Sequence, residues 1–268
     1  MKFSAFGQRA SRGSGIENLM DDLGKALSGS GPAPLMLGGG NPAHIPEMEA
    51  AWNQRLHEIL ADPATLRRTL AIYDPPRGNA AVLAALAALL RTELGWEVGP
   101  ENIAVTPGGQ TAFHFLFNLF GGKRPDGSPA RILLPLMPEY IGYANQGLEE
   151  GMFASQRPGI SRTAPHRFKY HIDFSNLQVD PDIGAICISR PTNPSGNLVS
   201  DEELTRLERL AAGRHEPRDP AQEIGIVAVD REAVGLHPLR VREGRRIAHH
   251  DVVLLARLRP GLEPLQAI

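Results

Sequence analysis

Between residues 102 and 212 the sequence alternates between short apolar runs typical of buried strands and longer segments with helical periodicity. We expect strands at 102–106, 131–136 and 183–189. We expect helices at 108–120, 138–148 and 200–212. Strands that alternate with helices are typical of α/β domains, because a connection between parallel strands has to cross a face of the sheet. The pattern therefore predicts an α/β domain with a mainly parallel sheet, whose ligands bind at the carboxyl ends of the strands.

Two further helices are expected before this alternation. The segment 46–60 has apolar residues at helical spacing, and the segment 80–94 consists mostly of alanine and leucine. Asn79 is a candidate N-cap for the second of these helices. Ser200 and Glu203 form a candidate capping box at the start of the helix at 200–212.

The composition excludes several classes of protein. With 42% hydrophobic and 22% charged residues it is ordinary for a soluble globular protein, and a formal net charge of −2 gives no reason to expect a nucleic acid or a membrane as partner. The single cysteine, Cys187, excludes an internal disulfide framework and fits a reducing compartment. The N-terminal sequence lacks the apolar stretch of a secretory signal, and no apolar run is long enough to span a membrane. We therefore expect a cytoplasmic protein.

A strand followed by two glycines and a helix forms the first candidate site. In "VTPGGQTAF" (105–113), Gly108, Gly109, Gln110 and Thr111 stand where this helix begins. Glycines let backbone N–H groups approach an anion, and a helix N-terminus favours negative charge. These residues can therefore cradle a phosphate, and the alternative is a plain tight turn. The segment has neither the Gly-Lys-Ser/Thr of a P-loop nor the glycine spacing of a dinucleotide fingerprint.

Three other loops contain residues that can contact a ligand. Tyr140 follows the strand at 131–136, and it can stack on a planar ring or be an ordinary core or rim aromatic. Gly39 and Gly40 lie in the Gly- and Pro-rich segment 31–44, which either brings backbone amides to a carboxylate or is a flexible crossing. The segment "SRPTNPSG" (189–196) is either a surface turn or a loop that presents one amide side chain to a cofactor.

Together these motifs resemble those of one enzyme family. The segments "LGGGNPA", "IYDPPRG", "TPGGQ", "PEYIGY" and "SRPTNPSG", together with "SGIENLMDDL", "NLFGGKRPDG" and "FKYHIDF", look like those of the aminotransferases of pyridoxal-phosphate fold type I. The resemblance covers residues 1 to about 212. It implies a three-layer α/β/α domain with a mainly parallel mixed sheet, truncated so that the C-terminal small domain is missing. By this resemblance, residues 1–50 are an N-terminal arm and small-domain segment, and residues 51–212 are part of the large domain that binds pyridoxal phosphate.

The resemblance assigns cofactor-binding roles to matching positions. Gly108, Gly109 and Gln110 would hold the phosphate of pyridoxal 5′-phosphate, and Tyr140 would stack on its pyridine ring. Asn193 would form a hydrogen bond with the phenolic oxygen of that ring, which helps to tune its electronic properties.

The resemblance also implies a substrate and a partner subunit. Tyr73 would reach the cofactor phosphate of a neighbouring subunit, which implies a homodimer. Gly39 and Gly40 would lie against the carboxylate of the substrate. Asp230, in "VAVDREAVG", has a faint likeness to the aspartate that the family places beside the pyridine nitrogen. The implied reaction transfers an amino group between an aliphatic amino acid such as valine and the 2-oxo acid pyruvate.

One residue that the family requires is absent. The family uses a lysine, well downstream of the asparagine loop, that forms a Schiff base with the cofactor. No lysine follows Lys169, which precedes Asn193 and which the resemblance places in a strand region away from the catalytic loop. Where the lysine segment belongs, "DVVLLARLRPG" offers Arg257 and Arg259, and an arginine cannot lose its proton in a protein. We therefore assign no catalytic residue.

Two functions of different classes are consistent with these observations. The first is a pyridoxal-phosphate-dependent aminotransferase, and the second is an inactive relative that lacks the Schiff-base lysine, which we favour for this chain. An unrelated nucleotide-binding α/β protein is a third alternative.

The segment 213–268 differs in character from the rest of the chain. It is dense in Arg, Pro and His, its helical periodicity is weak, and 225–229 and 251–256 are its candidate strands. We treat it as a divergent tail, and a reading-frame shift would produce such a change. That hypothesis fails if the other two frames, translated from codon 213 onward, contain neither Asp-Asn-Ala-Tyr-Gly nor Ser-Leu-Ser-Lys. His249 and His250 lack the spacing of common metal sites, so we expect no metal.

Overall fold

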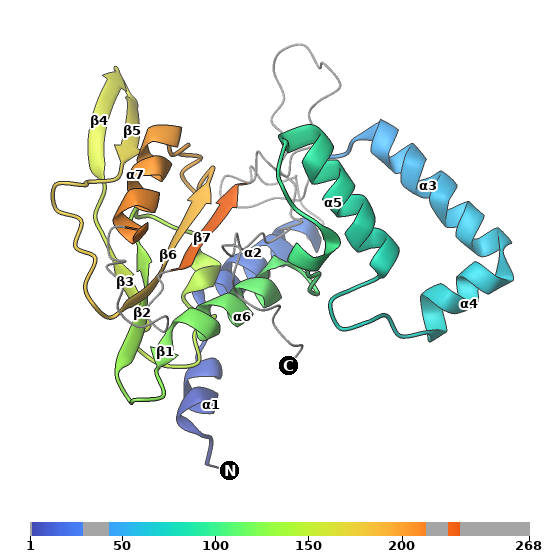
Figure 1. Ribbon diagram of the computed structural model, residues 1–268, viewed down its shortest axis with the longest axis horizontal. Coiled ribbons are helices and arrows are strands. Elements are labelled where there is room, and N and C mark those ends of the chain that lie inside the picture. The colour runs from blue at the N-terminus through green and yellow to red at the C-terminus, as the bar shows by residue number, and fades with distance from the viewer. Residues whose placement is uncertain (1, 29–42, 213–224, 231–268) are drawn as a thin grey trace.

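The computed structural model of the chain describes residues 2–28, 43–212 and 225–230 (Figure 1). Its main sheet consists of β1 (Gly122–Lys123), β2 (Pro129–Leu134), β3 (Phe153–Ser155), β6 (Ile183–Arg190) and β7 (Gly225–Asp230). β6 lies between β2 and β7, and β1 and β3 both pair with β2. The pairings of β2 with β3 and of β6 with β2 and β7 are parallel, and that of β1 with β2 is antiparallel. The expected mainly parallel mixed sheet is therefore confirmed.

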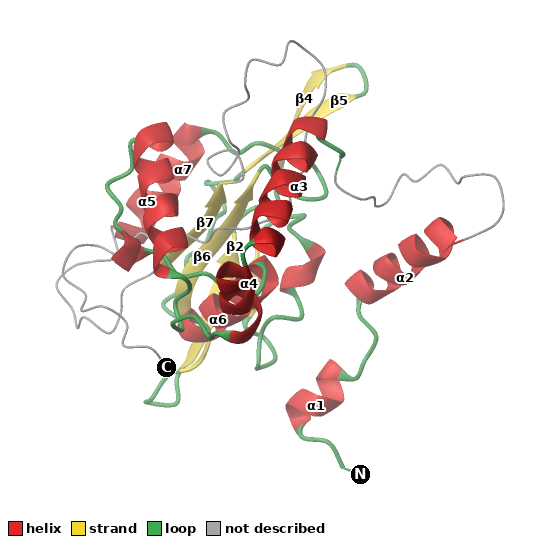
Figure 2. Ribbon diagram, turned by 90° about the vertical axis from the view of Figure 1, so that its right-hand side faces the viewer, coloured by secondary structure: helices red, strands yellow, loops and turns green. Residues whose placement is uncertain are grey.

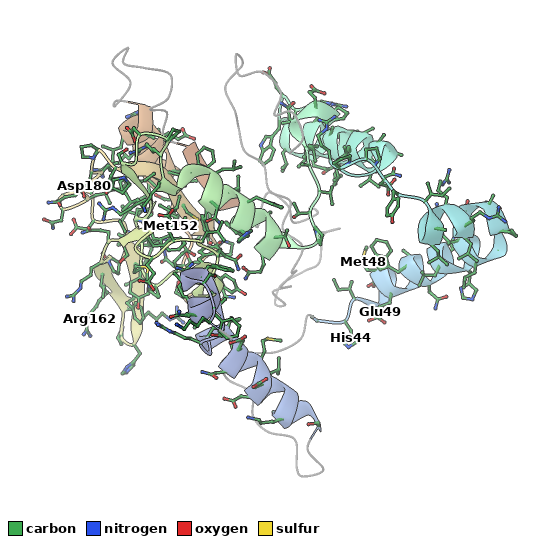
Figure 3. All side chains as sticks on the ribbon, turned by 90° about the horizontal axis from the view of Figure 1, so that it is seen from below. His44, Met48, Glu49, Met152, Arg162 and Asp180 are labelled. Carbon is green, nitrogen blue, oxygen red and sulfur yellow. The ribbon has the colours of Figure 1, made fainter. Side chains whose placement is uncertain are left out.

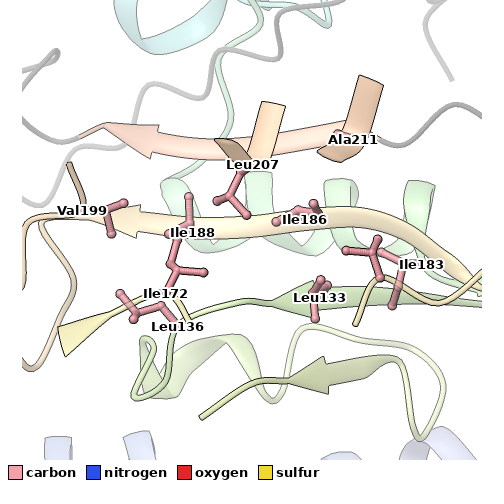
Figure 4. Close-up of a cluster of buried hydrophobic side chains, with 10 residues drawn as sticks. Leu133, Leu136, Ile172, Ile183, Ile186, Ile188, Val199, Leu207 and Ala211 are labelled. Carbon is pink, nitrogen blue, oxygen red and sulfur yellow. The ribbon is translucent and has the colours of Figure 1, made fainter. Parts of the chain in front are cut away.

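Helices cover both faces of this sheet. Successive side chains of a strand point to opposite faces, and on β6 the residues Ala185 and Cys187 pack with helix α6 (Gly109–Phe120). Ile186 and Ile188, which alternate with them, pack with helix α7 (Asp201–Ala212), as Figure 4 shows for the buried cluster around Leu207. The expected three-layer α/β/α arrangement is confirmed.

The remaining elements lie outside this core (Figures 1 and 2). The helices that precede it are α1 (Ala5–Ala10), α2 (Gly15–Ser28), α3 (Pro46–Ala61), α4 (Pro63–Ala71) and α5 (Ala80–Leu94). α5 buries Leu83, Ala87 and Leu90 against Ile103. β4 (Gly159–Ala164) and β5 (Arg167–His171) form a separate antiparallel hairpin.

Helices α3 and α4 lie apart from the sheet. They contact each other, but no side chain of either is buried. Figure 3 shows Met48 and Glu49, at the start of α3, well away from the side chains that pack around the sheet. Apolar residues such as Trp52 and Leu56 are consequently exposed.

The capping residues expected from the sequence are confirmed. The side-chain oxygen of Asn79 accepts hydrogen bonds from the N–H groups of Ala81 and Val82 at the start of α5. At the start of α7, Ser200 N donates to Glu203 Oε2 at 2.9 Å, and Glu203 N donates to Ser200 Oγ at 3.2 Å, which is a capping box. The expected helices at 46–60, 80–94, 108–120 and 200–212 all form, as do the strands at 131–136, 183–189 and 225–229.

Two expected elements do not form. Residues 103–106 make no strand pairing with the described strands. The backbone N–H group of Val105 instead donates a hydrogen bond to the carbonyl of Arg77, at 2.9 Å. A β-strand forms only where another segment pairs with it. An apolar run in the sequence does not show whether such a partner segment is present. The expected helix at 138–148 is a single 3₁₀ turn, η2 (Ile141–Tyr143), because Gly142 and Gly147 disfavour a helix and Tyr143 is buried in the core. The segments 31–42 and 251–256 lie outside the described residues.

Within the described ranges, none of the helices is both long and apolar enough to cross a bilayer.

Two leucines of α7 provide a matched test of the packing between this helix and the sheet. Leu207 is 1% exposed and belongs to the buried cluster, whereas Leu210 is 39% exposed. We expect Leu207→Ala to lower the free energy of unfolding by about 2–5 kcal/mol, because the substitution leaves a cavity. Leu210→Ala should change it by less than about 1 kcal/mol. Urea unfolding followed by circular dichroism measures both, and equal losses would contradict the assigned packing.

Candidate functional site

Helix α6 begins at the site that the two glycines predict. Gly108 precedes it with φ at 84°, a conformation that favours glycine, and no side chain of the described residues caps the helix. A Cβ atom placed on Gly108 would meet no atom of the described residues within 4 Å, so they leave the space beside it open. The first N–H groups of an α-helix have no partner within the helix. Those of Gly109 and Gln110 are therefore available to an anion.

Gly142 brings the Gln110 and Tyr140 side chains together. A Cβ atom placed on Gly142 would overlap the side-chain amide of Gln110 and lie 2.5 Å from Cε1 of the Tyr140 ring. Gln110 is also held by Gln146, whose Nε2 donates to its Oε1 at 2.7 Å. Two predicted cofactor-binding residues, from different loops, are thus neighbours in space.

The carboxyl group of Glu139 connects the tyrosine loop to strand β6. Its Oε1 accepts a hydrogen bond from Tyr140 N at 3.0 Å, and its Oε2 accepts one from Ser189 N at 3.1 Å. Close by, the hydroxyl groups of Tyr143 and Ser189 form a buried hydrogen bond of 2.8 Å. Both contacts fix the loop after β2 against the last residues of β6.

Asn193 lies in a tight turn directly after β6. Gly196 N donates to the carbonyl of Thr192 at 2.7 Å, and Thr192 N donates to that of Asn197 at 2.9 Å, which closes the turn. The Thr192 hydroxyl donates to the carbonyl of Ser189 and ties the turn to the strand. Asn193 itself is half-buried, and within the described ranges its amide forms no hydrogen bond. The amide is thus held at the sheet edge and is free to bind a ligand.

Asp230 occupies the corresponding end of the neighbouring strand. It is the last residue of β7, and its backbone stands opposite Arg190, the last residue of β6. The ends of β2, β6 and β7 therefore meet at one edge of the sheet, since the three strands run parallel. This edge is where α/β sheets commonly bind ligands.

Of the other predicted residues, the structure describes Tyr73. The Tyr73 side chain is fully exposed just after α4. Gly39 and Gly40 lie outside the described residues.

Lys169 lies close to the residues that follow Asn193. It is in strand β5, as the resemblance implies, and its Nζ donates to the carbonyl of Leu198 at 2.5 Å. The hairpin folds back onto the residues that follow Asn193, a long-range contact that the order of the segments does not reveal.

Glu139 is the functional residue that the sequence motifs did not identify. It is buried, and it is the single charged residue between positions 132 and 148. An isolated charge in an otherwise uncharged segment is the signal that could have found it, because buried charged groups need hydrogen-bond partners.

Burial makes the single cysteine of the chain inert. The pKa of the Cys187 thiol is raised well above its ordinary value, chiefly by loss of solvation in the core and further by the nearby Glu139 carboxylate. A nucleophilic or metal-binding thiol needs its thiolate form. In the described part of the chain, no group of three His, Cys, Asp or Glu residues is placed to hold a metal ion.

The residues at this edge fit a flat molecule that carries a phosphate. The uncapped start of α6 suits the phosphate, and the open space at Gly108 lets it approach. The ring of Tyr140 offers a face on which a planar ring can stack, and Asn193 offers an amide donor.

Comparison with known sequences identifies related proteins. No protein-family model matches the chain. The valine–pyruvate aminotransferase of Escherichia coli K12 is 49% identical over 211 residues, which are 79% of this chain and 50% of that protein. The aspartate/prephenate aminotransferase of Thermus thermophilus is 31% identical over 142 residues, 52% of this chain and 34% of that protein. The chain thus spans half or less of the length of these curated relatives.

Solved structures give the same result for the fold. A Psychrobacter arcticum crystal structure assigned as an amino-acid aminotransferase matches 88% of this chain and 62% of its own chain, with a TM-score of 0.73 at 35% identity. The valine–pyruvate aminotransferase of Salmonella typhimurium matches 83% of this chain and 58% of its own, with a TM-score of 0.62 at 40% identity. The resemblance to the aminotransferases expected from the motifs is confirmed.

Gly142 provides a test of the contact between Gln110 and Tyr140. We expect Gly142→Ala to lower the free energy of unfolding by about 1–3 kcal/mol, because the added methyl group overlaps both side chains. Gly24→Ala is the control, since a Cβ atom there meets nothing within 4 Å and alanine favours the helix. Urea unfolding and the near-ultraviolet circular dichroism of the tyrosines report the change. Equal stabilities of Gly142→Ala and the unmodified chain would contradict the geometry.

Proposed function

We propose that this chain, a relative in sequence and fold of the pyridoxal-phosphate-dependent aminotransferases of fold type I, binds pyridoxal 5′-phosphate at the carboxyl edge of its sheet. The observation that supports this most strongly is the convergence of an uncapped, glycine-led helix start with the Tyr140 ring and the turn of Asn193. When bound, this cofactor supplies an electron-withdrawing ring that makes exchange of an amino group possible. The residues of the chain contribute binding and orientation.

The phosphate is held by the start of α6. The N–H groups of Gly109 and Gln110 donate to it, and Gly108 leaves room for its approach. The helix dipole adds a favourable interaction with the negative charge.

The ring is held by side chains from the other loops. Tyr140 stacks on one face, and its position is fixed by Gly142 and by the Glu139 carboxyl group. Asn193 donates its amide hydrogen to the phenolic oxygen of the ring. We assign Asp230 to the pyridine nitrogen, because its backbone lies at the same sheet edge.

The substrates, assembly and location that we propose rest on the related enzymes. The name of the E. coli relative points to valine and pyruvate, and other aliphatic amino acids share the same chemistry. Gly39 and Gly40 are assigned to the substrate carboxylate. The fully exposed Tyr73 is assigned to the cofactor phosphate of a second copy, in a cytoplasmic homodimer.

We also propose that this chain binds the cofactor without transaminating. No lysine follows Lys169 in the sequence, and the Lys169 ammonium group is engaged with the carbonyl of Leu198. The arginines of the tail cannot serve as the proton-transferring base, because they keep their protons. Because the Schiff-base lysine is absent, we expect the chain to bind the cofactor but not to catalyse transamination.

Titration with pyridoxal 5′-phosphate, followed by its absorbance and by protein fluorescence, tests both statements. We expect saturable binding that Asn193→Ala weakens about tenfold, the loss of one hydrogen bond of roughly 1–1.5 kcal/mol. Asn53→Ala, on the exposed face of α3, should bind like the unmodified chain.

Mixing valine, pyruvate and cofactor with the chain should give no alanine above a protein-free blank. Failure to bind the cofactor would contradict the proposed site. Protein-dependent formation of alanine would contradict only the proposal that the chain does not transaminate.

A further inference from the structure

A pocket of about 560 Å³ lies between the β4–β5 hairpin and the turn that follows Asn193. Its walls are Thr163 of β4, residues 168–170 of β5, residues 194–198 and Pro138. None of Gly108, Gly109, Gln110, Tyr140 and Asn193 lines it. The pocket is therefore not explained by the cofactor-binding residues.

Lys169 is the one charged side chain among the residues that line this pocket. Its Nζ donates to the carbonyl of Leu198, which uses one of three N–H donors and leaves two for a ligand. The β4–β5 hairpin contributes Arg162 and Arg167 and has no acidic residue. Figure 3 shows Arg162 at the outer edge of the molecule. These two arginines do not line the pocket, but no acidic side chain of the described residues lines it either, so the ammonium group of Lys169 favours an anion there.

Half of the residues that line the pocket are aromatic or apolar. The rings of Phe168 and Tyr170 are 5.1 Å apart at an angle of 70°, and Pro194 and Pro138 complete the lining. Phe168 is 58% exposed although it is a large apolar side chain. Such a wall suits a planar or branched apolar group.

Asn197 adds an unpaired donor to this lining. Its Oδ1 accepts a hydrogen bond from Tyr170 N at 3.1 Å, which fixes the orientation of the amide. Its Nδ2 has no hydrogen-bond partner among the described residues, although the residue is only 9% exposed. Buried polar groups without a partner are rare, and a ligand oxygen would supply one.

We propose that this pocket binds a small carboxylate with a planar or branched apolar body. The carboxylate pairs with the ammonium group of Lys169, and the apolar body lies against Phe168, Tyr170 and the prolines. Pro194 and Ser195 directly follow Asn193, so an occupant would also brace the turn that holds the cofactor-binding amide. The site goes beyond the proposed function and does not depend on cofactor binding.

Benzoate is a suitable probe, with benzamide as its uncharged analogue of the same shape. Titration of the full chain, followed by amide shifts of residues 168–170 and 195–198 in ¹H–¹⁵N spectra, should show saturable binding of benzoate. Benzamide should bind at least about tenfold more weakly, because it lacks the charge that pairs with Lys169.

Substitutions distinguish an effect of charge on benzoate binding from an effect on folding. Lys169→Ala should weaken benzoate binding at least about tenfold, and Lys169→Arg should retain most of the binding. Lys123→Ala, on β1, is the control and should leave benzoate binding unchanged. Because Lys169 also holds Leu198, its removal can disturb the fold. Thr163→Asp avoids this difficulty because Thr163 is exposed. The carboxylate of the introduced aspartate would repel benzoate, and Thr163→Asn is the uncharged control of similar size.

The proposal fails if the shifts do not saturate or fall outside the lining residues. It also fails if benzamide binds as well as benzoate, or if Thr163→Asp and Thr163→Asn bind benzoate equally. Weakening by Lys169→Ala with unchanged binding in Lys123→Ala, together with weaker binding in Thr163→Asp than in Thr163→Asn, supports it.

Discussion

The carboxyl group of Glu139 is the contact on which the arrangement of the site depends. It accepts hydrogen bonds from Tyr140 N and from Ser189 N, so it joins the loop after β2 to the end of β6. Hydrogen bonds to a charged acceptor are the strong ones, roughly 1.5–3 kcal/mol each, and leaving a buried donor unpaired costs a similar amount. Tyr140 N and Ser189 N share this carboxyl group, and the Thr192 hydroxyl ties the asparagine turn to Ser189, so the fold sets the relative positions of the tyrosine loop and the turn.

The parallel sheet provides the frame for this contact. β2, β6 and β7 end at one edge, and each is followed or closed by a residue assigned to the cofactor, namely Tyr140, Asn193 and Asp230. Helices α6 and α7 hold the strands from opposite faces. The start of α6 then faces the same group of loops, since Gln110 is in contact with Gly142 and Gln146. The proposed site is therefore prepared by the packing of the sheet and its helices.

The sequence predicted the elements whose signal is local and failed where the outcome depends on distant residues. The helix that starts at Gly109 and the capping box of Ser200 and Glu203 follow from short-range chemistry, and both are confirmed. The extended segment at 103–106 was misjudged because a strand needs a partner strand. The helix expected from residue 138 was misjudged because Tyr143 is buried in the core, in a segment where Gly142 and Gly147 already disfavour a helix. Glu139, and the contact of Lys169 with Leu198, join residues far apart in sequence, so periodicity and spacing carried no information about them.

The central claim is that the start of α6 and the loops at the sheet edge form a binding site for a phosphate-bearing ring. Calorimetric titration of the chain with pyridoxal 5′-phosphate and with pyridoxal, which has the same ring without the phosphate, tests this claim most directly. If the N–H groups of Gly109 and Gln110 hold the phosphate, the phosphorylated form should bind about a hundredfold more tightly, as two charge-assisted hydrogen bonds would give. Equal affinities for the two compounds would contradict the account.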